Sequence, residues 1–153
     1  MEYEYSYRVT DLTEYLEYVN ENYEFVEMFK ETRVIYRGNG TIARITYKDD
    51  DMYLDFKEDK MRDGGLIERK ESKRIKFDDV DSCEDILSFL GYKKDNTISR
   101  YRSIYTGDGI KFEIDEYIEP KGLVFSFEGD KEVCDKVDLE LKDLHDKYKI
   151  SEE

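Results

Sequence analysis

The chain has 153 residues, and its 25 Lys and Arg stand against 39 Asp and Glu, which gives a formal net charge of −14. This acidic balance argues against general binding to nucleic acids or anionic membranes, which requires a positive surface. The length suits a single domain over residues 1–153, and 14 Tyr and 8 Phe provide core-forming side chains that disordered chains lack.

The sequence carries no recognisable targeting or membrane segment. No apolar run approaches the roughly 18 residues that cross a bilayer, and the start MEYEYSYR lacks the apolar stretch of a secretory signal. Cys83 and Cys134 have no CxxC spacing, so we expect free, packed thiols and a cytoplasmic protein. The single histidine, His145, is expected on the surface of the last helix.

Strands and one helix alternate through the first half of the chain. A helix is expected from about Asp11, where Asp11 and Glu14 form a capping pattern. Asn39-Gly40 is a strong signal for a two-residue hairpin. Period-two alternation of side chains marks the strands. The strands predicted here cover residues 2–8, 33–37, 41–47 and 52–58.

The second half follows the same pattern. A second helix is expected from Asp81, with Glu84 completing the capping pattern and Gly91 ending it in the left-handed conformation. Asp108-Gly109 predicts another hairpin, and a last helix runs from about Asp130 to Tyr148. The strands predicted here cover residues 66–77, 97–105, 110–117 and 123–128.

Roughly eight antiparallel strands joined by short turns fit a closed or nearly closed eight-stranded β-barrel. With about three flanking helices, the predicted fold class is α+β.

One face of most strands is charged, with both signs present. Arg100 and Arg102 share a face of one strand, and Lys111, Glu113 and Asp115 share a face of the next. These faces could simply contact water, as in many antiparallel sheets. Alternatively, they point into a barrel lumen, where basic side chains would bind phosphate oxygens and carboxylates would hold Mg²⁺ or Mn²⁺. Alternation alone does not choose between the two.

The charged motifs recur in a definite order along the chain. The first strand reads E-Y-E-Y-S, and the later strands contribute TIARIT, YLDFK and ERKE. A helix ending in L-G-Y precedes RYRSIY, and the last two strands contribute FEIDEY and SFE.

This series resembles the CYTH group of triphosphate tunnel metalloenzymes over nearly the whole chain. In that family the first strand reads E-x-E-x-K, an arginine and a lysine follow on later strands, and then R-x-E, K-x-R-x-x-Y, an Asp-Glu pair and a final E-x-E. The resemblance implies a tunnel barrel that binds a small triphosphate or polyphosphate with Mg²⁺ or Mn²⁺, as a monomer or homodimer.

The resemblance also assigns roles residue by residue, although it leaves the carboxylate that orients the attacking water unassigned. The residues implied to bind phosphate are Arg44, Lys57, Arg69, Arg100 and Arg102. The residues implied to bind metal are Glu2, Glu4, Asp115 and Glu128.

Two positions depart from the family pattern. Ser6 stands where the first-strand lysine belongs, and Ser126 stands where the first glutamate of the final E-x-E belongs. The function implied is metal-dependent hydrolysis of inorganic, thiamine or nucleoside triphosphate. Because loss of one such contact can cost orders of magnitude in rate, two alternatives remain: a catalytically weak or inactive polyphosphate- or nucleotide-binding protein, and an adenylate cyclase.

Overall fold

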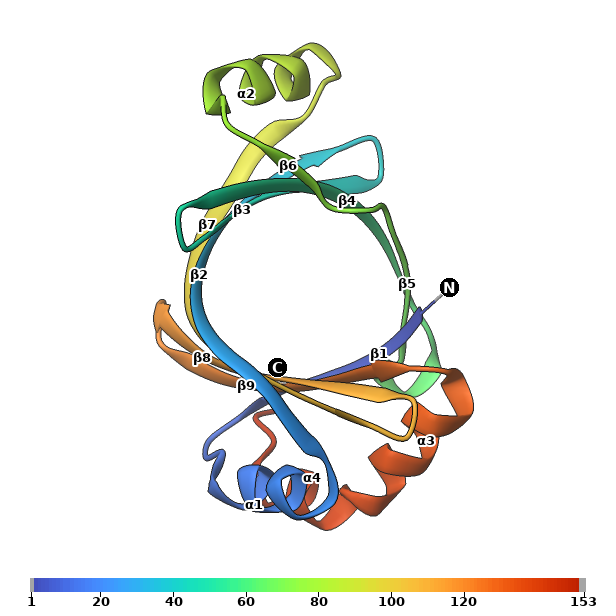
Figure 1. Ribbon diagram of the computed structural model, residues 1–153. Coiled ribbons are helices and arrows are strands. Elements are labelled where there is room, and N and C mark those ends of the chain that lie inside the picture. The colour runs from blue at the N-terminus through green and yellow to red at the C-terminus, as the bar shows by residue number, and fades with distance from the viewer. Residues whose placement is uncertain (1, 152–153) are drawn as a thin grey trace.

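The structure is a computed structural model that describes residues 2–151. Eight strands close into an antiparallel barrel, and β4 pairs back with β3 to complete the ring (Figure 1). Around the barrel the order is β3-β2-β7-β8-β9-β1-β5-β4, with the short β6 added beside β4. The predicted α+β barrel is therefore confirmed. The strands are β1 (Glu2–Val9), β2 (Glu24–Gly38), β3 (Thr41–Lys48), β4 (Asp51–Met61), β5 (Ile67–Glu71), β6 (Ile75–Phe77), β7 (Lys93–Gly107), β8 (Ile110–Glu119) and β9 (Gly122–Gly129).

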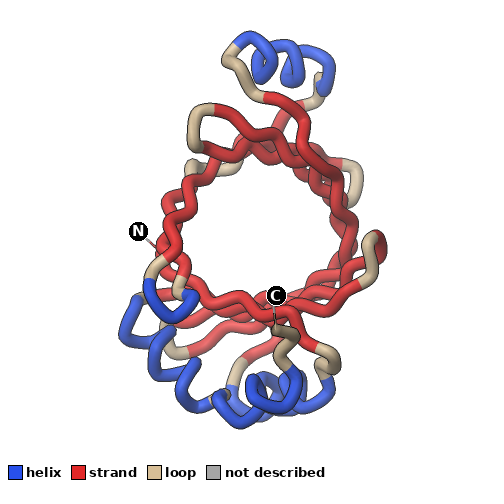
Figure 2. The backbone as a smooth tube through the Cα atoms, turned by 180° about the vertical axis from the view of Figure 1, so that it is seen from behind, coloured by secondary structure: helices blue, strands red, loops and turns tan. Residues whose placement is uncertain are grey.

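The helices lie on the outside of the barrel. α1 (Thr13–Asn22), α3 (Lys131–Glu140) and α4 (Lys142–Tyr148) cover one side, and α2 (Val80–Phe89) lies on the opposite side (Figure 2). A 3₁₀ turn spans Asp63–Gly65. The predicted last helix is divided at Leu141, a buried residue that ends α3 and precedes α4. None of the helices in residues 2–151 is long and apolar enough to cross a membrane.

Local signals placed the hairpins correctly. Asn39 and Gly40 both have positive φ, at 49° and 76°, and Asp108 and Gly109 have 51° and 77°. Positive φ at both central residues is the geometry of the turn that matches the twist of the flanking strands. The two hairpins β2–β3 and β7–β8 are therefore in the predicted register.

Some predicted boundaries were wrong. The expected strand at 66–77 is two strands, β5 and β6, separated by residues 72–74. The strand expected at 33–37 is the last third of the 15-residue β2. The cap of α2 is Asp79 rather than Asp81, because the Asp79 carboxylate accepts a hydrogen bond from the Ser82 backbone N–H at 3.1 Å.

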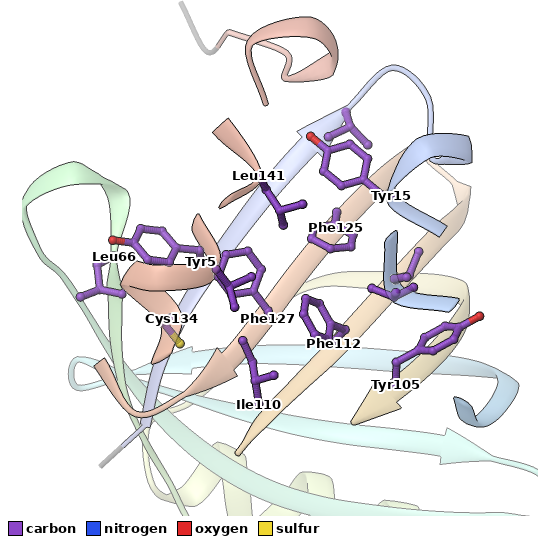
Figure 3. Close-up of a cluster of buried hydrophobic side chains, with 14 residues drawn as sticks. Tyr5, Tyr15, Leu66, Tyr105, Ile110, Phe112, Phe125, Phe127, Cys134 and Leu141 are labelled. Carbon is purple, nitrogen blue, oxygen red and sulfur yellow. The ribbon is translucent and has the colours of Figure 1, made fainter. Parts of the chain in front are cut away.

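The main apolar core lies outside the barrel, between the sheet and the helices. Phe112, Phe125 and Phe127 project from β8 and β9 toward α1 and α3, where they pack beside Tyr15 and Cys134 (Figure 3). A smaller cluster packs under α2 and includes Cys83 and Leu87. Both cysteines are free, as predicted, and both are buried.

His145 is not a surface residue, contrary to the prediction. Its side chain is 9% exposed, its Nδ1 lies 3.0 Å from the Tyr15 hydroxyl, and its ring packs against Tyr7. The prediction was wrong because α4 turns this position toward the sheet rather than toward solvent.

We expect Phe125→Ala to lower the free energy of unfolding by about 3–5 kcal/mol, because it leaves a cavity beneath fully buried aromatic neighbours. The same substitution at Phe89, which is 91% exposed on α2, should change it by less than about 0.5 kcal/mol. Urea unfolding followed by circular dichroism measures both. Equal effects of the two substitutions would contradict this placement of the core.

Candidate functional site

The charged faces of the strands line one cavity inside the barrel. Its volume is about 570 Å³, and its lining includes residues from every strand of the ring. Ten basic and eight acidic side chains line it, so positive charge exceeds negative charge inside a chain whose formal net charge is −14. The lumen interpretation is therefore correct for these faces. The basic lining residues are Arg33, Arg37, Arg44, Lys48, Lys57, Arg69, Arg74, Arg100, Arg102 and Lys111.

The predicted phosphate-binding residues all line this cavity, and each is held by carboxylates. Arg44 forms a two-pronged pair with Asp55, in which Nε donates at 2.9 Å and Nη2 at 2.5 Å. Arg102 forms the same kind of pair with Asp115, at 2.7 and 2.9 Å. Two parallel hydrogen bonds fix the plane of a guanidinium group as well as its position. These arginines are therefore oriented before any ligand arrives.

Arg69 and Lys57 share one carboxylate, that of Asp59. Arg69 donates from Nε at 2.8 Å and Lys57 from Nζ at 2.9 Å. Arg69 also lies 2.9 Å from Glu4, on the neighbouring strand β1. Arg69 thus connects this basic group directly to the carboxylate of Glu4 on the adjoining strand.

Glu31 connects the arginines at the β2–β7 wall. Its Oε1 accepts hydrogen bonds from Nε and Nη2 of Arg100 at 2.9 and 2.6 Å, and it lies 3.2 Å from Nη2 of Arg33. Burial alone would raise the pKa of Glu31, but Arg33 and Arg100 outweigh it and hold the pKa below its usual range. Glu31 is therefore a carboxylate that stays charged because its neighbours are cationic.

Three carboxylates meet at one place in the lumen. Oxygen atoms of Glu4, Glu113 and Glu128, from β1, β8 and β9, all lie within 4.8 Å of one another. Burial and the neighbouring Glu113 raise the pKa of Glu128 to about 7, and burial raises the pKa of Glu4. We call these three residues the acidic trio.

The acidic trio has the chemistry of a site for a hard divalent cation. All its donors are carboxylate oxygens, which Mg²⁺ and Mn²⁺ prefer. Burial and neighbouring carboxylates disfavour the negative charges of Glu4 and Glu128, whereas burial at Glu113 is outweighed by Arg102 and Lys111, which hold its pKa below the usual range. The residues present therefore fit the metal that the sequence resemblance implies.

The trio differs from the predicted metal set in two places. Glu2 is exposed and does not line the lumen cavity, and Asp115 pairs with Arg102 instead of joining the trio. Glu113 takes the place beside Glu4 and Glu128. The sequence showed that Glu113 shares a face of β8 with Asp115, two residues later. Nothing in the sequence indicated which of the two carboxylates would lie beside Glu4 and Glu128.

Arg33 and Glu31 were missed by sequence reasoning. Both lie on β2, are buried, and line the lumen. The only signal was that they share one strand face with Ile35 and Arg37 at every second position, and it became clear only once β2 was seen to continue back to Glu24.

The two departures from the family pattern lie next to each other. Ser6 of β1 stands directly opposite Ser126 of β9 in the strand register, and their hydroxyl oxygens are 2.9 Å apart. Both line the cavity. The two positions at which the family pattern would place a lysine and a glutamate are thus occupied here by one neutral, hydrogen-bonded pair.

Solved structures share this barrel. A conserved hypothetical protein from Pyrococcus furiosus aligns with a TM-score of 0.72 and 21% identity, over 95% of this chain and 89% of that one. This chain therefore has the fold of that structure, which is consistent with the resemblance to the CYTH group. The candidate adenylyl cyclase HpAC1 from Hippeastrum aligns over 100% of this chain and 92% of its own, at a TM-score of 0.67 and 14% identity. A dominant triphosphatase activity is described for that protein.

A candidate adenylate cyclase from Vibrio parahaemolyticus shares the fold as well. It covers 95% of this chain and 86% of its own, with a TM-score of 0.63 and 16% identity. No family model matches the sequence, and no curated protein matches it at a significant level. At these identities the likeness establishes the fold of the chain.

We expect Glu31→Gln to lower the free energy of unfolding by about 3–5 kcal/mol, because it leaves buried guanidinium groups without their counter-charge. Asp95→Asn removes the carboxylate of the exposed Arg37–Asp95 pair, whose side chains are 61% and 45% exposed, and should cost less than about 1 kcal/mol. Thermal and urea unfolding report both. A Glu31→Gln protein as stable as the Asp95→Asn protein would show that Glu31 does not stabilise the buried guanidinium groups of Arg33 and Arg100.

Proposed function

We propose that this protein hydrolyses a small triphosphate bound in the barrel lumen, with Mg²⁺ or Mn²⁺ held by the acidic trio. The observation that carries the proposal is the convergence of oriented guanidinium groups from β2, β3, β5 and β7 on a cavity that also contains the trio. A cavity of about 570 Å³ lies within the usual range for small-molecule sites, about 300–1,000 Å³.

In this proposal, the guanidinium groups of Arg44, Arg69 and Arg102 bind the phosphate oxygens. Arg102 is bound to Asp115 through Nε and Nη2 and to Glu113 through Nη1. The Arg102 guanidinium already points into the lumen, and on binding its N–H groups would exchange carboxylate oxygens for phosphate oxygens. Arg33 and Arg100 extend the same cationic wall. Such fixed donors stabilise charge that develops on a transferring phosphoryl group without having to reorganise during the reaction.

The acidic trio would hold the metal next to this wall. A divalent cation bound there supplies positive charge for the phosphate oxygens and acidifies a bound water. Arg69 bridges the two parts, because it contacts Glu4 of the trio and Asp59 beside Lys57. We assign to Arg69 the positioning of the phosphate chain relative to the trio.

Two of the fold neighbours support a triphosphate ligand. The Hippeastrum protein is described as having a dominant triphosphatase activity, and the Vibrio parahaemolyticus protein as an adenylate cyclase candidate. Both descriptions concern a triphosphate as substrate, and the activity described as dominant for the Hippeastrum protein is the one proposed here.

Binding without turnover is the second candidate function, and the Ser6–Ser126 pair favours it. A neutral pair at this point gives neither a cation for phosphate nor a carboxylate for metal. The remaining arginines would still bind a triphosphate, because none of them contacts either serine among the hydrogen bonds and ion pairs described for residues 2–151.

We expect phosphate release from at least one of inorganic, thiamine and nucleoside triphosphate in the presence of Mg²⁺ or Mn²⁺, and none in excess chelator. A colorimetric phosphate assay over this panel measures it. Formation of cyclic AMP from ATP without phosphate release would support the cyclase alternative instead.

A matched pair of variants ties that activity to the lumen. Arg102→Gln removes a guanidinium that lines the lumen and should weaken triphosphate binding by about 10–100-fold. Arg62→Gln removes the exposed guanidinium of Arg62, which pairs with the partly buried Glu68 outside the lumen, and should leave binding unchanged. Isothermal titration calorimetry distinguishes them. Tight triphosphate binding without release would select the second candidate, and absence of binding would refute both.

We also expect Mn²⁺ alone to raise the melting temperature of the protein, because an ion that binds only the folded state stabilises it. Combining Glu4→Gln with Glu128→Gln should abolish the shift, since it removes two of the three carboxylates of the trio. Glu132→Gln, on the exposed surface of α3, is the control and should keep the shift. A shift that survives in the double variant would place the metal elsewhere.

A further inference from the structure

The first half of β2 has a neighbouring strand on one side only. Residues 24–30 pair with β7, from Glu24 opposite Thr106 to Lys30 opposite Tyr101. Pairing with β3 on the other side begins only at Glu31, opposite Lys48. Within residues 2–151, this stretch therefore presents a row of backbone N–H and C=O groups without a strand partner. An edge of this kind is a template for pairing with another chain.

Two other open edges of the same sheet are better protected than the β2 edge. β6 is only three residues long and has Lys76 at its centre. The β7 edge at residues 93–98, beyond the end of β8 pairing, reads K-K-D-N-T-I. Short length and charged side chains are common ways of blocking edge pairing. The β2 edge instead reads E-F-V-E-M-F-K, with charges mainly at its two ends.

Large apolar side chains are exposed along this edge. Phe25, Val26 and Met28 are 52%, 53% and 64% exposed. Tyr101 on the adjoining β7 is a further 44% exposed. A bulge between Phe25 and Glu27 twists the strand, which is itself a partial protection, but it leaves these side chains uncovered.

We propose that this edge, residues 24–30 of β2, pairs antiparallel with the same edge of a second copy of the chain to form a closed homodimer. The charge pattern selects the second copy as the partner. Antiparallel pairing of two identical edges places Glu24 at one end beside Lys30 of the other copy, twice in the dimer, and places apolar side chains between them. A two-fold contact of this kind uses the same surface on both copies and does not propagate into a fibre.

The central charge of the edge is already neutralised within each copy. Glu27 lies 3.1 Å from Lys48 Nζ, and Lys48 also lies over the ring of Phe29. The two Glu27 side chains that meet near the dimer axis therefore each bring a bound counter-charge. Because Glu27, Phe29 and Lys48 also line the lumen, the dimer would place the corresponding openings of the two barrels next to each other.

A charge-swap series tests the dimer without altering the lumen arginines. Sedimentation equilibrium of the full chain over a concentration series should give a monomer–dimer equilibrium. Glu24→Lys alone and Lys30→Glu alone should each weaken the dimer by at least about tenfold, since each replaces two attractive contacts with two repulsive ones. The double variant should restore it. A monomer at every concentration, or single variants that dimerise like the unchanged protein, would overturn the proposal.

Apolar variants distinguish this surface from the other exposed apolar positions. Met28→Lys should give a monomer, whereas Leu139→Lys, at a position 74% exposed on α3, should dimerise normally. Phe89→Lys probes the exposed end of α2 in the same way. A dimer lost with Phe89→Lys but kept with Met28→Lys would place the interface on α2 and reject the β2 edge, as would a ladder of larger oligomers. Circular dichroism of each variant confirms that loss of the dimer is not loss of the fold.

Discussion

Charge pairing across the lumen is the interaction on which the rest of the structure depends. The interior of this barrel contains ten basic and eight acidic side chains, and a buried charge is costly unless it is paired and hydrogen-bonded. Almost every predicted phosphate-binding residue is accordingly held by a carboxylate on an adjacent strand, as Arg44 is by Asp55. Because the inside is occupied by ion pairs, apolar burial must come from the outer faces. This is why α1, α3 and α4 cover β1, β8 and β9, and why α2 covers a second apolar cluster.

The same pairing couples the proposed ligand to the proposed metal. The lumen has only a small excess of positive charge, and a triphosphate brings more negative charge than that excess. Each phosphate oxygen that engages an arginine also competes with a carboxylate such as Asp115. A divalent cation at the acidic trio would offset both effects, since it adds positive charge and satisfies carboxylates that repel one another. Binding of the two ligands would then be mutually favourable, in the sense of thermodynamic linkage.

Local patterns in the sequence were sufficient to predict most of the strands and the hairpins, whereas the placement of the charged faces inside a barrel lumen rested on the family resemblance. Period-two alternation placed Arg100 and Arg102 on one face, and Asn39-Gly40 fixed a hairpin and its register. The remaining errors come from contacts distant in sequence. Arg102, on another strand, pairs with both Glu113 and Asp115, and only the packing of β8 beside β9 and β1 brings Glu113 rather than Asp115 next to Glu4 and Glu128. His145 is buried because α4 packs against Tyr7 and Tyr15, and no pattern within the helix itself indicates that.

The pairing of Ser6 with Ser126 has a consequence for how this lumen could have diverged from those of its relatives. The two positions face each other across neighbouring strands, so a lysine at one and a glutamate at the other would compensate each other. Changing either alone would leave a single charge in the lumen without its natural partner, and the intermediate sequence would be less stable than either end state. The two positions are therefore expected to vary together, as a unit, in any alignment of closely related sequences. A change at one position is thus coupled to a change at the other, although the two residues are 120 positions apart in the chain.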